Sequence, residues 1–402
     1  MTTFVKRIQF LYFDAGGGHR AAATALKSVI EEHIAGHIEA QRRPWDVTLV
    51  NVQELLHSLD IFRKLTGIRL EDIYNLMLAR GWTLGASTGL KLIHGAIRAY
   101  HEPIVKMLTR HFRDTRPDLV VSLIPNFNRA ISQSVHAGSS ETPVCTILTD
   151  FADYPPHFWM ERARPEIPRR FVICGTDRAA DQARDLGYDD AHVFRVSGMI
   201  LRPRFYEAMA PDHPMDRAAF RTDERKRLGL DPDRPTGLVL FGGQGSKVML
   251  DIARRLPDTQ LIFICGRNES LAGKLRGFVE NRHRAPLHVE GFTSEIPYFM
   301  RLADFFIGKP GPGSITEALA MRLPVMVESN AWTLPQERYN AEWVRERGVG
   351  MVLPNFRGVR EAVTEMLRSL DKYRARVADI ENRAVFEIPD ILERLMSSAA
   401  GG

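Results

Sequence analysis

The chain has 402 residues, enough for two or three domains of about 150 residues each. Of these residues 44% are hydrophobic and 26% charged, so the composition excludes a disordered chain, and no apolar run approaches the roughly 18 residues that a membrane-spanning helix needs. The formal net charge of +5 would suit nucleic acid or anionic lipid, but no Lys/Arg block or aromatic RNA-binding signature is present, which argues against nucleic acid.

The N-terminal residues lead directly into a predicted strand. Met1 to Ile8 has neither the apolar core nor the small-residue cleavage site of a signal peptide. We therefore expect a cytoplasmic protein.

Apolar runs typical of buried strands alternate with helical segments along the chain. The predicted strands are Ile8 to Phe13, Val47 to Val50, Leu119 to Leu123, Val144 to Leu148, Phe171 to Ile173, His192 to Val196, Leu238 to Phe241, Leu261 to Ile264, Leu287 to Val289, Phe305 to Ile307 and Pro324 to Val327. This alternation predicts an α/β protein with two doubly wound, Rossmann-like domains that face one another across a cleft. Arg202 to Pro235 is rich in proline and charge, which gives predicted domains 1–205 and 236–402 joined by a linker at 206–235.

A first glycine-rich turn follows the first strand. Gly16 to Gly18 and His19 precede an alanine-rich helix predicted from Arg20 to about Ile34. The glycines leave room for a ligand, and a helix start disfavours a protonated imidazole, so His19 could act as a general base. The alternative is that His19 only completes a tight turn.

The segment from Ile61 to Phe112 combines cations with apolar side chains. Between Arg63 and Arg113 there are nine Lys or Arg against three acids, with Trp82 and several leucines among them. This composition suits a surface that inserts apolar side chains into a membrane and pairs its cations with anionic headgroups. Helices packed on the sheet with a solvated basic face are the alternative.

Two more glycine-rich turns follow strands of the second half. One is Gly242-Gly243-Gln244-Gly245, and the other is Gly311-Pro312-Gly313-Ser314. Neither has the spacing of a phosphate-binding loop that ends in Gly-Lys-Ser/Thr, or of the dehydrogenase Gly-x-Gly-x-x-Gly motif, which argues against an ATPase and against hydride transfer.

The third turn begins a stretch that predicts a nucleotide-sugar site. Ser314 opens a predicted helix, whose free N–H groups and positive dipole end suit a diphosphate. Glu317, one turn further on, could accept from a ribose diol, and Gln336, Glu337 and Asn340 suit the hydroxyls of a hexose. The alternative is a strand-to-helix turn with a first-turn acid and solvated polar residues.

No metal site is predicted. His94, His101, His111, His136 and His157 lack ligand-like spacing with carboxylates or cysteines. The cysteines are Cys145, Cys174 and Cys265, each in a predicted strand and expected in the core. We also expect Trp45, Trp159 and Trp343 to be packing residues.

Several motifs, in this order, resemble one known family. They are Gly16-Gly-Gly-His-Arg-Ala, Cys265-Gly-Arg-Asn, Gly291-Phe-Thr, Gly311-Pro-Gly-Ser-Ile-Thr-Glu-Ala, and Gln336-Glu with Asn340. From Phe10 to about Leu353 the sequence resembles the monogalactosyldiacylglycerol synthase and diacylglycerol glucosyltransferase group, which is related to the peptidoglycan lipid-intermediate N-acetylglucosaminyltransferase. The resemblance implies a GT-B fold and an inverting transferase. It would move a hexose from a UDP-sugar to a lipid, most directly diacylglycerol, as a peripheral protein on the cytoplasmic face of an anionic membrane, with no cofactor.

The resemblance also assigns roles by position. His19 would be the base, and Asp150 would lie near the acceptor; these are the predicted catalytic residues. Phe292 and the Thr293 backbone would hold uracil, Glu317 the ribose, Ser314 and Gln244 the diphosphate, and Gln336 and Glu337 the sugar. The predicted substrate-binding set is Gly17, Gly18, Gly243, Gln244, Arg267, Phe292, Thr293, Gly313, Ser314, Glu317, Gln336, Glu337 and Asn340.

Three other functions stay open. One is a GT-B transferase with a polyprenyl or saccharide-lipid acceptor, and another is a nucleotide-sugar 2-epimerase, which shares the fold and needs no lipid. The third is a catalytically silent subunit that binds a nucleotide sugar or recruits a partner to the membrane. The presence of His19 together with Gln336 and Glu337 argues against the silent subunit.

Overall fold

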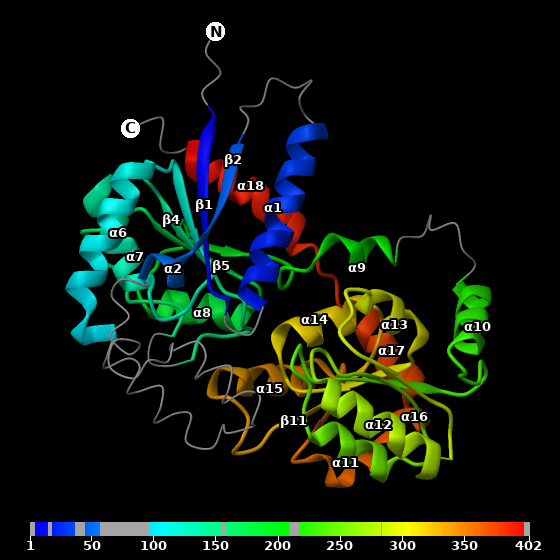
Figure 1. Ribbon diagram of the computed structural model, residues 1–402. Helices are drawn as coiled ribbons and strands as arrows, with labels where there is room; N and C mark the ends of the chain where they lie inside the picture. Colours follow the sequence, from blue (N-terminus) through cyan, green and yellow to red (C-terminus); the bar gives the residue numbers. More distant parts are fainter. Residues whose placement is uncertain are drawn as a thin grey trace. The chain divides into compact units, whose positions relative to one another are not determined.

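The computed structural model describes residues 5–14, 18–36, 45–56, 97–154, 158–209, 217–282 and 284–397. These residues form two compact units (Figure 1). Unit 1 contains the described residues up to Pro203 and those from Asn382 onward, and unit 2 contains the described residues from Arg204 to Glu381.

Unit 1 is built on a parallel sheet of six strands among the described residues, in the order β2-β1-β3-β4-β5-β6. The strands are β1 (Lys6–Tyr12), β2 (Trp45–Asn51), β3 (Leu119–Ser122), β4 (Val144–Ile147), β5 (Arg170–Cys174) and β6 (Val193–Arg195). Every residue of β3 and β4 is buried, as expected for parallel strands covered on both faces. The strand order changes direction between β1 and β3, and the carboxyl ends of strands at such a point are where doubly wound sheets bind ligands.

Helices surround this sheet. They are α1 (Gly18–Gly36), α2 (Val52–Leu56), α6 (His101–Thr115), α7 (Asn128–Gly138), α8 (Asp177–Asp185) and α18 (Ala384–Ser397), and α9 (Pro203–Glu207) lies at the boundary with unit 2. Leu108, Phe112 and Ile131 of α6 and α7 pack with Leu11 and Val120 of the sheet in one core cluster. The three cysteines are free and buried, which confirms that they are core residues.

The C-terminal helix belongs to unit 1, whereas the sequence predicted that the second domain continues to residue 402. Asn382 Nδ2 donates to the Met199 carbonyl over 2.9 Å, and Ser197 N donates to Glu387 Oε2 over 2.8 Å. A Cβ on Gly198 would lie 2.6 Å from Asn382 Cγ, so only glycine permits this approach. The apolar face of α18, including Ile388 and Leu392, is thereby buried on unit 1.

Unit 2 has a second parallel sheet, of six strands among the described residues, in the order β12-β11-β10-β7-β8-β9. The strands are β7 (Thr236–Leu240), β8 (Gln260–Ile264), β9 (Leu287–Glu290), β10 (Phe305–Gly308), β11 (Val325–Glu328) and β12 (Gly350–Leu353). Its direction changes between β7 and β10, so the loops after these two strands flank the expected ligand position.

The helices of unit 2 cover the sheet and share its core. They are α10 (Arg217–Arg227), α11 (Val248–Arg255), α12 (Glu269–Arg282), α13 (Ile296–Leu302), α14 (Pro312–Ala320), α15 (Arg338–Arg347), α16 (Val359–Arg368) and α17 (Leu370–Ala378), with short 3-10 helices η3 (Pro335–Glu337) and η4 (Phe356–Gly358). Met249 of α11, Phe263 of the sheet and Val363 of α16 are buried in one core cluster.

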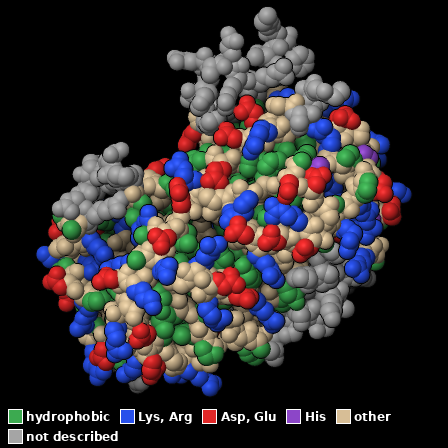
Figure 2. All heavy atoms as spheres, turned by 180° about the vertical axis from the view of Figure 1, so that it is seen from behind, with side chains coloured by type: hydrophobic (Ala, Val, Ile, Leu, Met, Phe, Trp, Pro, Cys, Tyr) green, Lys and Arg blue, Asp and Glu red, His purple; other side chains and the backbone are tan. Residues whose placement is uncertain are grey.

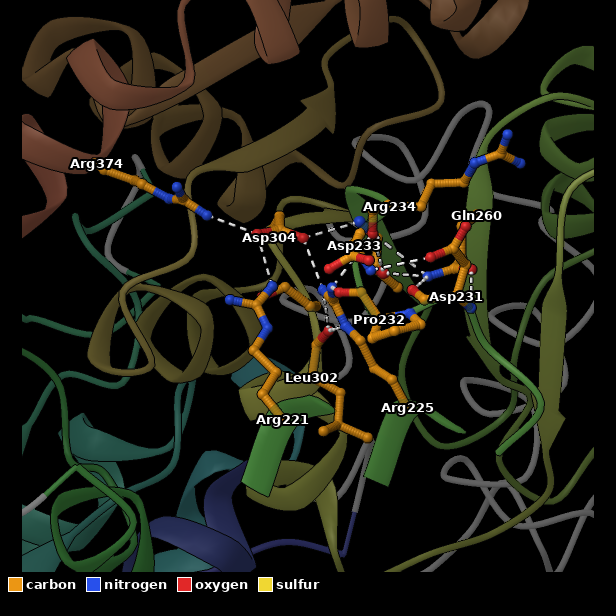
Figure 3. Close-up of polar contacts among 12 residues, drawn as sticks. Arg221, Arg225, Asp231, Pro232, Asp233, Arg234, Gln260, Leu302, Asp304 and Arg374 are labelled. Atoms are coloured by element: carbon orange, nitrogen blue, oxygen red, sulfur yellow. Dashed lines mark hydrogen bonds and ion pairs between the residues drawn. The ribbon is translucent and has the colours of Figure 1, made fainter. Parts of the chain in front are cut away.

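At the amino end of this sheet, Asp304 holds several elements together (Figure 3). Its carboxylate contacts guanidinium nitrogens of Arg221 and Arg374 at 2.6 Å and of Arg225 at 2.8 Å, and accepts from Thr236 N. Burial by itself raises the pKa of Asp304, but Arg221, the Thr236 N–H and Arg225 outweigh it and hold the pKa below its ordinary value. Part of the predicted linker, helix α10, is thus fixed to unit 2.

The structure confirms the two doubly wound domains and gives a counterpart to each predicted strand. Strand β12 was not predicted from the sequence, and its residues Gly350–Leu353 are all half-buried. The cleft between the domains stays a prediction.

Candidate functional site

His19 is the second residue of α1, at the carboxyl end of β1. Its Nδ1 is buried without a hydrogen-bond partner among the described residues. Burial lowers the pKa of His19 from 6.5 to about 4, so the imidazole is neutral at physiological pH. The sequence predicted a neutral imidazole because of the helix dipole. In the structure, burial is the cause of the lowered pKa. Gly18 begins α1, and Gly17 lies outside the described residues.

The side chain of Trp159 contacts both Asp150 and His19. Asp150 is 8% exposed, and its Oδ2 accepts from Trp159 Nε1 over 2.8 Å. The Trp159 ring in turn meets the His19 ring edge to face, with 5.8 Å between centroids and 82° between planes. The two predicted catalytic residues, which are 131 positions apart in sequence, therefore contact one indole.

Trp159 is fixed by several hydrogen bonds. Asp153 accepts from the backbone N–H of Trp159 over 2.7 Å and of Met160 over 3.3 Å, and Asn128 Nδ2 donates to the Trp159 carbonyl over 2.7 Å. The sequence reading expected Trp159 to be a packing residue; it is 1% exposed and does pack, but it also binds Asp150. Asp150 and Asp153 directly follow a buried strand, and this pair is a sequence signal from which the loop could have been found.

In unit 2, the loops after β7 and β8 interlock. Arg267 N donates to the Gly243 carbonyl over 2.9 Å, and Asn268 Nδ2 donates to the Gln244 carbonyl over 3.2 Å. Gly266 has a φ of +59°, and a Cβ there would lie 2.3 Å from the Gly243 carbonyl oxygen, so the close approach requires glycine. Predicted residues from two turns thus form one rigid surface.

An exposed aromatic residue follows β9. Phe292 is 61% exposed, and the guanidinium of Arg267 lies 5.0 Å from the centre of its ring. Thr293 Oγ1 accepts from Glu295 N over 2.9 Å, which shapes the turn that presents Phe292. An exposed ring beside a cation is a surface on which a planar base can stack.

The loop after β10 leads into α14, which begins at Pro312 rather than at the predicted Ser314. Its N-cap, Gly311, provides no side-chain hydrogen bond, and a Cβ on Gly313 would meet no atom within 4 Å. Open space therefore adjoins the first turn of α14. Ser314 and Glu317 lie on α14 and are half-buried.

The predicted sugar-binding residues follow β11. Gln336 is half-buried and Glu337 is 7% exposed, and Lys309 Nζ contacts Glu337 Oε1 at 2.8 Å. Asn340 is fully buried, and its Nδ2 donates to the Pro310 carbonyl over 3.0 Å. Asn340 thus holds the β10 loop against α15. Lys309 was not among the predicted residues.

The membrane segment predicted from Ile61 lies outside the described residues up to residue 96. Among the residues that are described, no helix is both long and apolar enough to cross a membrane. On the face drawn in Figure 2, Lys and Arg alternate with Asp and Glu, and neither charge gathers in one place.

Comparison with known families identifies the domain that contains the loops after β7 to β11. Residues 238–395 match the glycosyltransferase family 28 C-terminal domain. The matched domain covers 158 of the 402 residues and indicates a glycosyltransferase. This domain includes the interlocked loops after β7 and β8, the Phe292 turn, α14 and the Lys309–Glu337 pair.

Curated relatives of this glycosyltransferase include enzymes of glycolipid synthesis. The chain is 27% identical to monogalactosyldiacylglycerol synthase of Spinacia oleracea over 90% of its length and 66% of the spinach protein. It is also 27% identical to a probable monogalactosyldiacylglycerol synthase 2 of Oryza sativa subsp. indica, over 99% of its length and 82% of the rice protein. These matches confirm the predicted family resemblance.

Solved structures share the fold. MurG of Acinetobacter baumannii is 12% identical with a TM-score of 0.57, covering 97% of this chain and 99% of that one. UDP-GlcNAc 2-epimerase of Neisseria meningitidis, bound to UDP-GlcNAc, is 14% identical with a TM-score of 0.56, covering 96% and 100%. The GT-B fold and the class of glycosyltransferase are confirmed, while the individual roles of the site residues stay predictions.

Proposed function

We propose that this glycosyltransferase moves a hexose from a UDP-sugar to the hydroxyl of a membrane lipid, most directly diacylglycerol, with inversion at the anomeric carbon. The observation that carries the proposal is the set of loops at the carboxyl ends of β7 to β11. The exposed ring of Phe292 follows β9, the start of α14 without a side-chain cap follows β10, and the carboxylate of Glu337 follows β11. A base, a diphosphate and a sugar require these three kinds of group.

The donor's parts are distributed along the sheet. Phe292 would stack on uracil beside Arg267, and Glu317 would accept from the ribose hydroxyls. The first turn of α14, with Ser314, would face the diphosphate, because free N–H groups and the dipole favour negative charge there. Glu337 would accept from hydroxyls of the hexose.

Unit 1 would supply the proton acceptor. The acceptor oxygen attacks the anomeric carbon, the bond from that carbon to the diphosphate oxygen breaks, and UDP leaves with the electron pair. The hydroxyl proton passes to the neutral imidazole of His19. A base with a pKa near 4 is weak, so we expect ligand binding to raise its basicity by bringing charge beside the imidazole. Trp159 orients both His19 and Asp150.

Lipid analysis tests the proposal directly. Purified protein is incubated with vesicles that contain diacylglycerol and with UDP-glucose or UDP-galactose, and UDP release, chromatographic mobility of the lipid and the anomeric coupling constant are measured. We expect a β-linked glycolipid from an α-linked donor. Turnover of the UDP-sugar without lipid would instead indicate an epimerase. Binding of UDP-sugar without turnover on any lipid acceptor would indicate a silent subunit.

The proposed acceptor group is the hydroxyl of a lipid. The curated names favour diacylglycerol, whereas MurG shares only the fold. Replacing diacylglycerol with a polyprenyl-linked saccharide in the same vesicles distinguishes the two acceptors. For localisation, we propose a peripheral protein on the cytoplasmic face, which flotation of the protein with vesicles would test.

A further inference from the structure

Lys309 lies between two loops of unit 2 that flank the change of strand order. Its Cε would be 3.8 Å from a Cβ placed on Gly242, in the loop after β7, and 3.3 Å from one placed on Gly311, the N-cap of α14. A side chain on Gly311 would crowd the lysine chain, whereas one on Gly242 would make only an ordinary contact with it. The ammonium group therefore stands beside the space that adjoins the first turn of α14.

The partner of Lys309 is more buried than Lys309 itself. The Glu337 side chain is 10% exposed, the Lys309 side chain is 36% exposed, and their charged atoms are 2.8 Å apart. A buried carboxylate needs a hydrogen-bonding partner, so Lys309 stabilises Glu337 when no ligand is present. The ammonium still faces solvent, which screens the pair and makes its exchange for another partner inexpensive.

Space for another partner is present on both sides. A Cβ on Gly243 or on Gly313 would meet no atom within 4 Å. The loop that carries Lys309 is held in place, because Asn340 donates to the Pro310 carbonyl and Gly311 N donates to the Lys309 carbonyl. Only the lysine side chain has to move to meet an anion in this space.

We propose that Lys309 is the cation that neutralises the donor's diphosphate and that its pair with Glu337 couples diphosphate binding to recognition of the hexose. This inference rests on the proposed function of unit 2 as the donor site. When a diphosphate takes the ammonium, the Glu337 carboxylate loses its partner and accepts from hydroxyls of the hexose instead. A complete donor supplies both partners, whereas UDP supplies only the diphosphate.

The first test compares ligands that differ in charge. Calorimetry with UDP and saturation-transfer NMR with uridine are applied to the full chain and to Lys309→Met. We expect the affinity for UDP to fall about 10-fold or more, its dependence on salt to weaken, and uridine binding to stay unchanged, because uridine carries no phosphate. Lys309→Arg should restore most of the affinity for UDP, and Lys372→Met, an exposed lysine on α17, is the matched control.

The second test uses Glu337→Gln, which removes the carboxylate charge beside the Lys309 ammonium and near the diphosphate. The affinity for UDP should rise severalfold, while the affinity for UDP-glucose or UDP-galactose should fall relative to UDP. A variant that had merely lost stability would lose affinity for both ligands.

The outcomes separate this inference from the proposed function. A wild-type chain that binds no UDP overturns both. A chain that binds UDP and keeps that affinity in Lys309→Met leaves the donor site in place and overturns the role of Lys309. Equal changes in UDP and UDP-hexose affinity in Glu337→Gln overturn the coupling.

Discussion

Substitution of His19 by glutamine should change how the stability of the protein depends on pH. The pKa of His19 is lowered by burial from 6.5 to about 4 in the folded protein, whereas the unfolded chain has the ordinary value. Between these two values the unfolded state binds one proton more than the folded state, so stability rises with pH. The contribution is complete above pH 6.5 and is lost as the pH falls towards 4.

The magnitude follows from the two pKa values. Moving from pH 7 to pH 5 should cost the wild-type protein about 2 kcal/mol through His19 alone. His19→Gln lacks this proton, so its free energy of unfolding should fall by about 2 kcal/mol less over the same interval. Urea unfolding of both proteins at pH 7, 6 and 5 measures the difference, and tryptophan fluorescence is a suitable signal because Trp159 lies against His19.

Histidine NMR provides the independent readout. The resonance that is absent in His19→Gln should show a neutral ring down to about pH 5, because the pKa is about 4. If both proteins lose the same free energy of unfolding between pH 7 and pH 5, or if that resonance titrates near 6.5, the imidazole is not buried as described. Burial then does not hold this base neutral.

Four further predictions concern the donor site, the transfer rate, Asp304 and the segment from Ile61. Glu317→Ala should weaken UDP binding by about 1 to 3 kcal/mol by calorimetry, since it removes the proposed hydrogen-bond partner of the ribose, and unchanged affinity would place the ribose elsewhere. His19→Ala should keep UDP and vesicle binding but lose about 100-fold or more in transfer rate; near-normal turnover would give the base role to another group. Asp304→Asn should lower the free energy of unfolding by about 3 kcal/mol because it removes the charged partner of the buried Arg225 guanidinium and of the more exposed Arg221 and Arg374, and a thermal midpoint equal to wild type would contradict this. Vesicle binding should rise with anionic lipid and fall with salt, and Trp82→Ser with Leu84→Ser should reduce it even at low salt, unless the segment from Ile61 is an ordinary packed subdomain.

The sheets could be predicted because parallel strands that are covered on both faces are short, almost wholly apolar runs. Val144–Ile147 and Phe305–Gly308 are buried at every residue, and their sequences show it. Gly350–Leu353 has the same length, but it is half-buried throughout and begins with glycine, so its sequence is less typical of a buried strand. The return of α18 to unit 1 depends on contacts such as Asn382 to Met199, which join residues 183 positions apart and leave no local pattern.

The site could be predicted in part for a related reason. Glycine-rich turns after strands mark the carboxyl ends of a doubly wound sheet, so Gly243, Gly313 and His19 are visible in the sequence. Lys309 and Trp159 were missed because lysine and tryptophan are common on surfaces and in cores. Their importance comes from partners 28 and 9 positions away, Glu337 and Asp150, which only the fold brings into contact.

Unit 2 distributes its charged contacts unevenly between the two ends of its sheet. At the amino end, one carboxylate, Asp304, binds three arginines from α10 and α17 and the first residue of β7, so these elements are cross-linked by buried charge (Figure 3). At the carboxyl end, glycine-rich loops adjoin open space, and the Lys309–Glu337 pair is partly exposed to solvent. Breaking a buried pair costs several kcal/mol, whereas exchanging a partly exposed one costs little. The Asp304 cluster can therefore hold the loops in register at one end of the sheet, while at the other end the proposed exchange of the ion pair lets an anionic donor bind and leave.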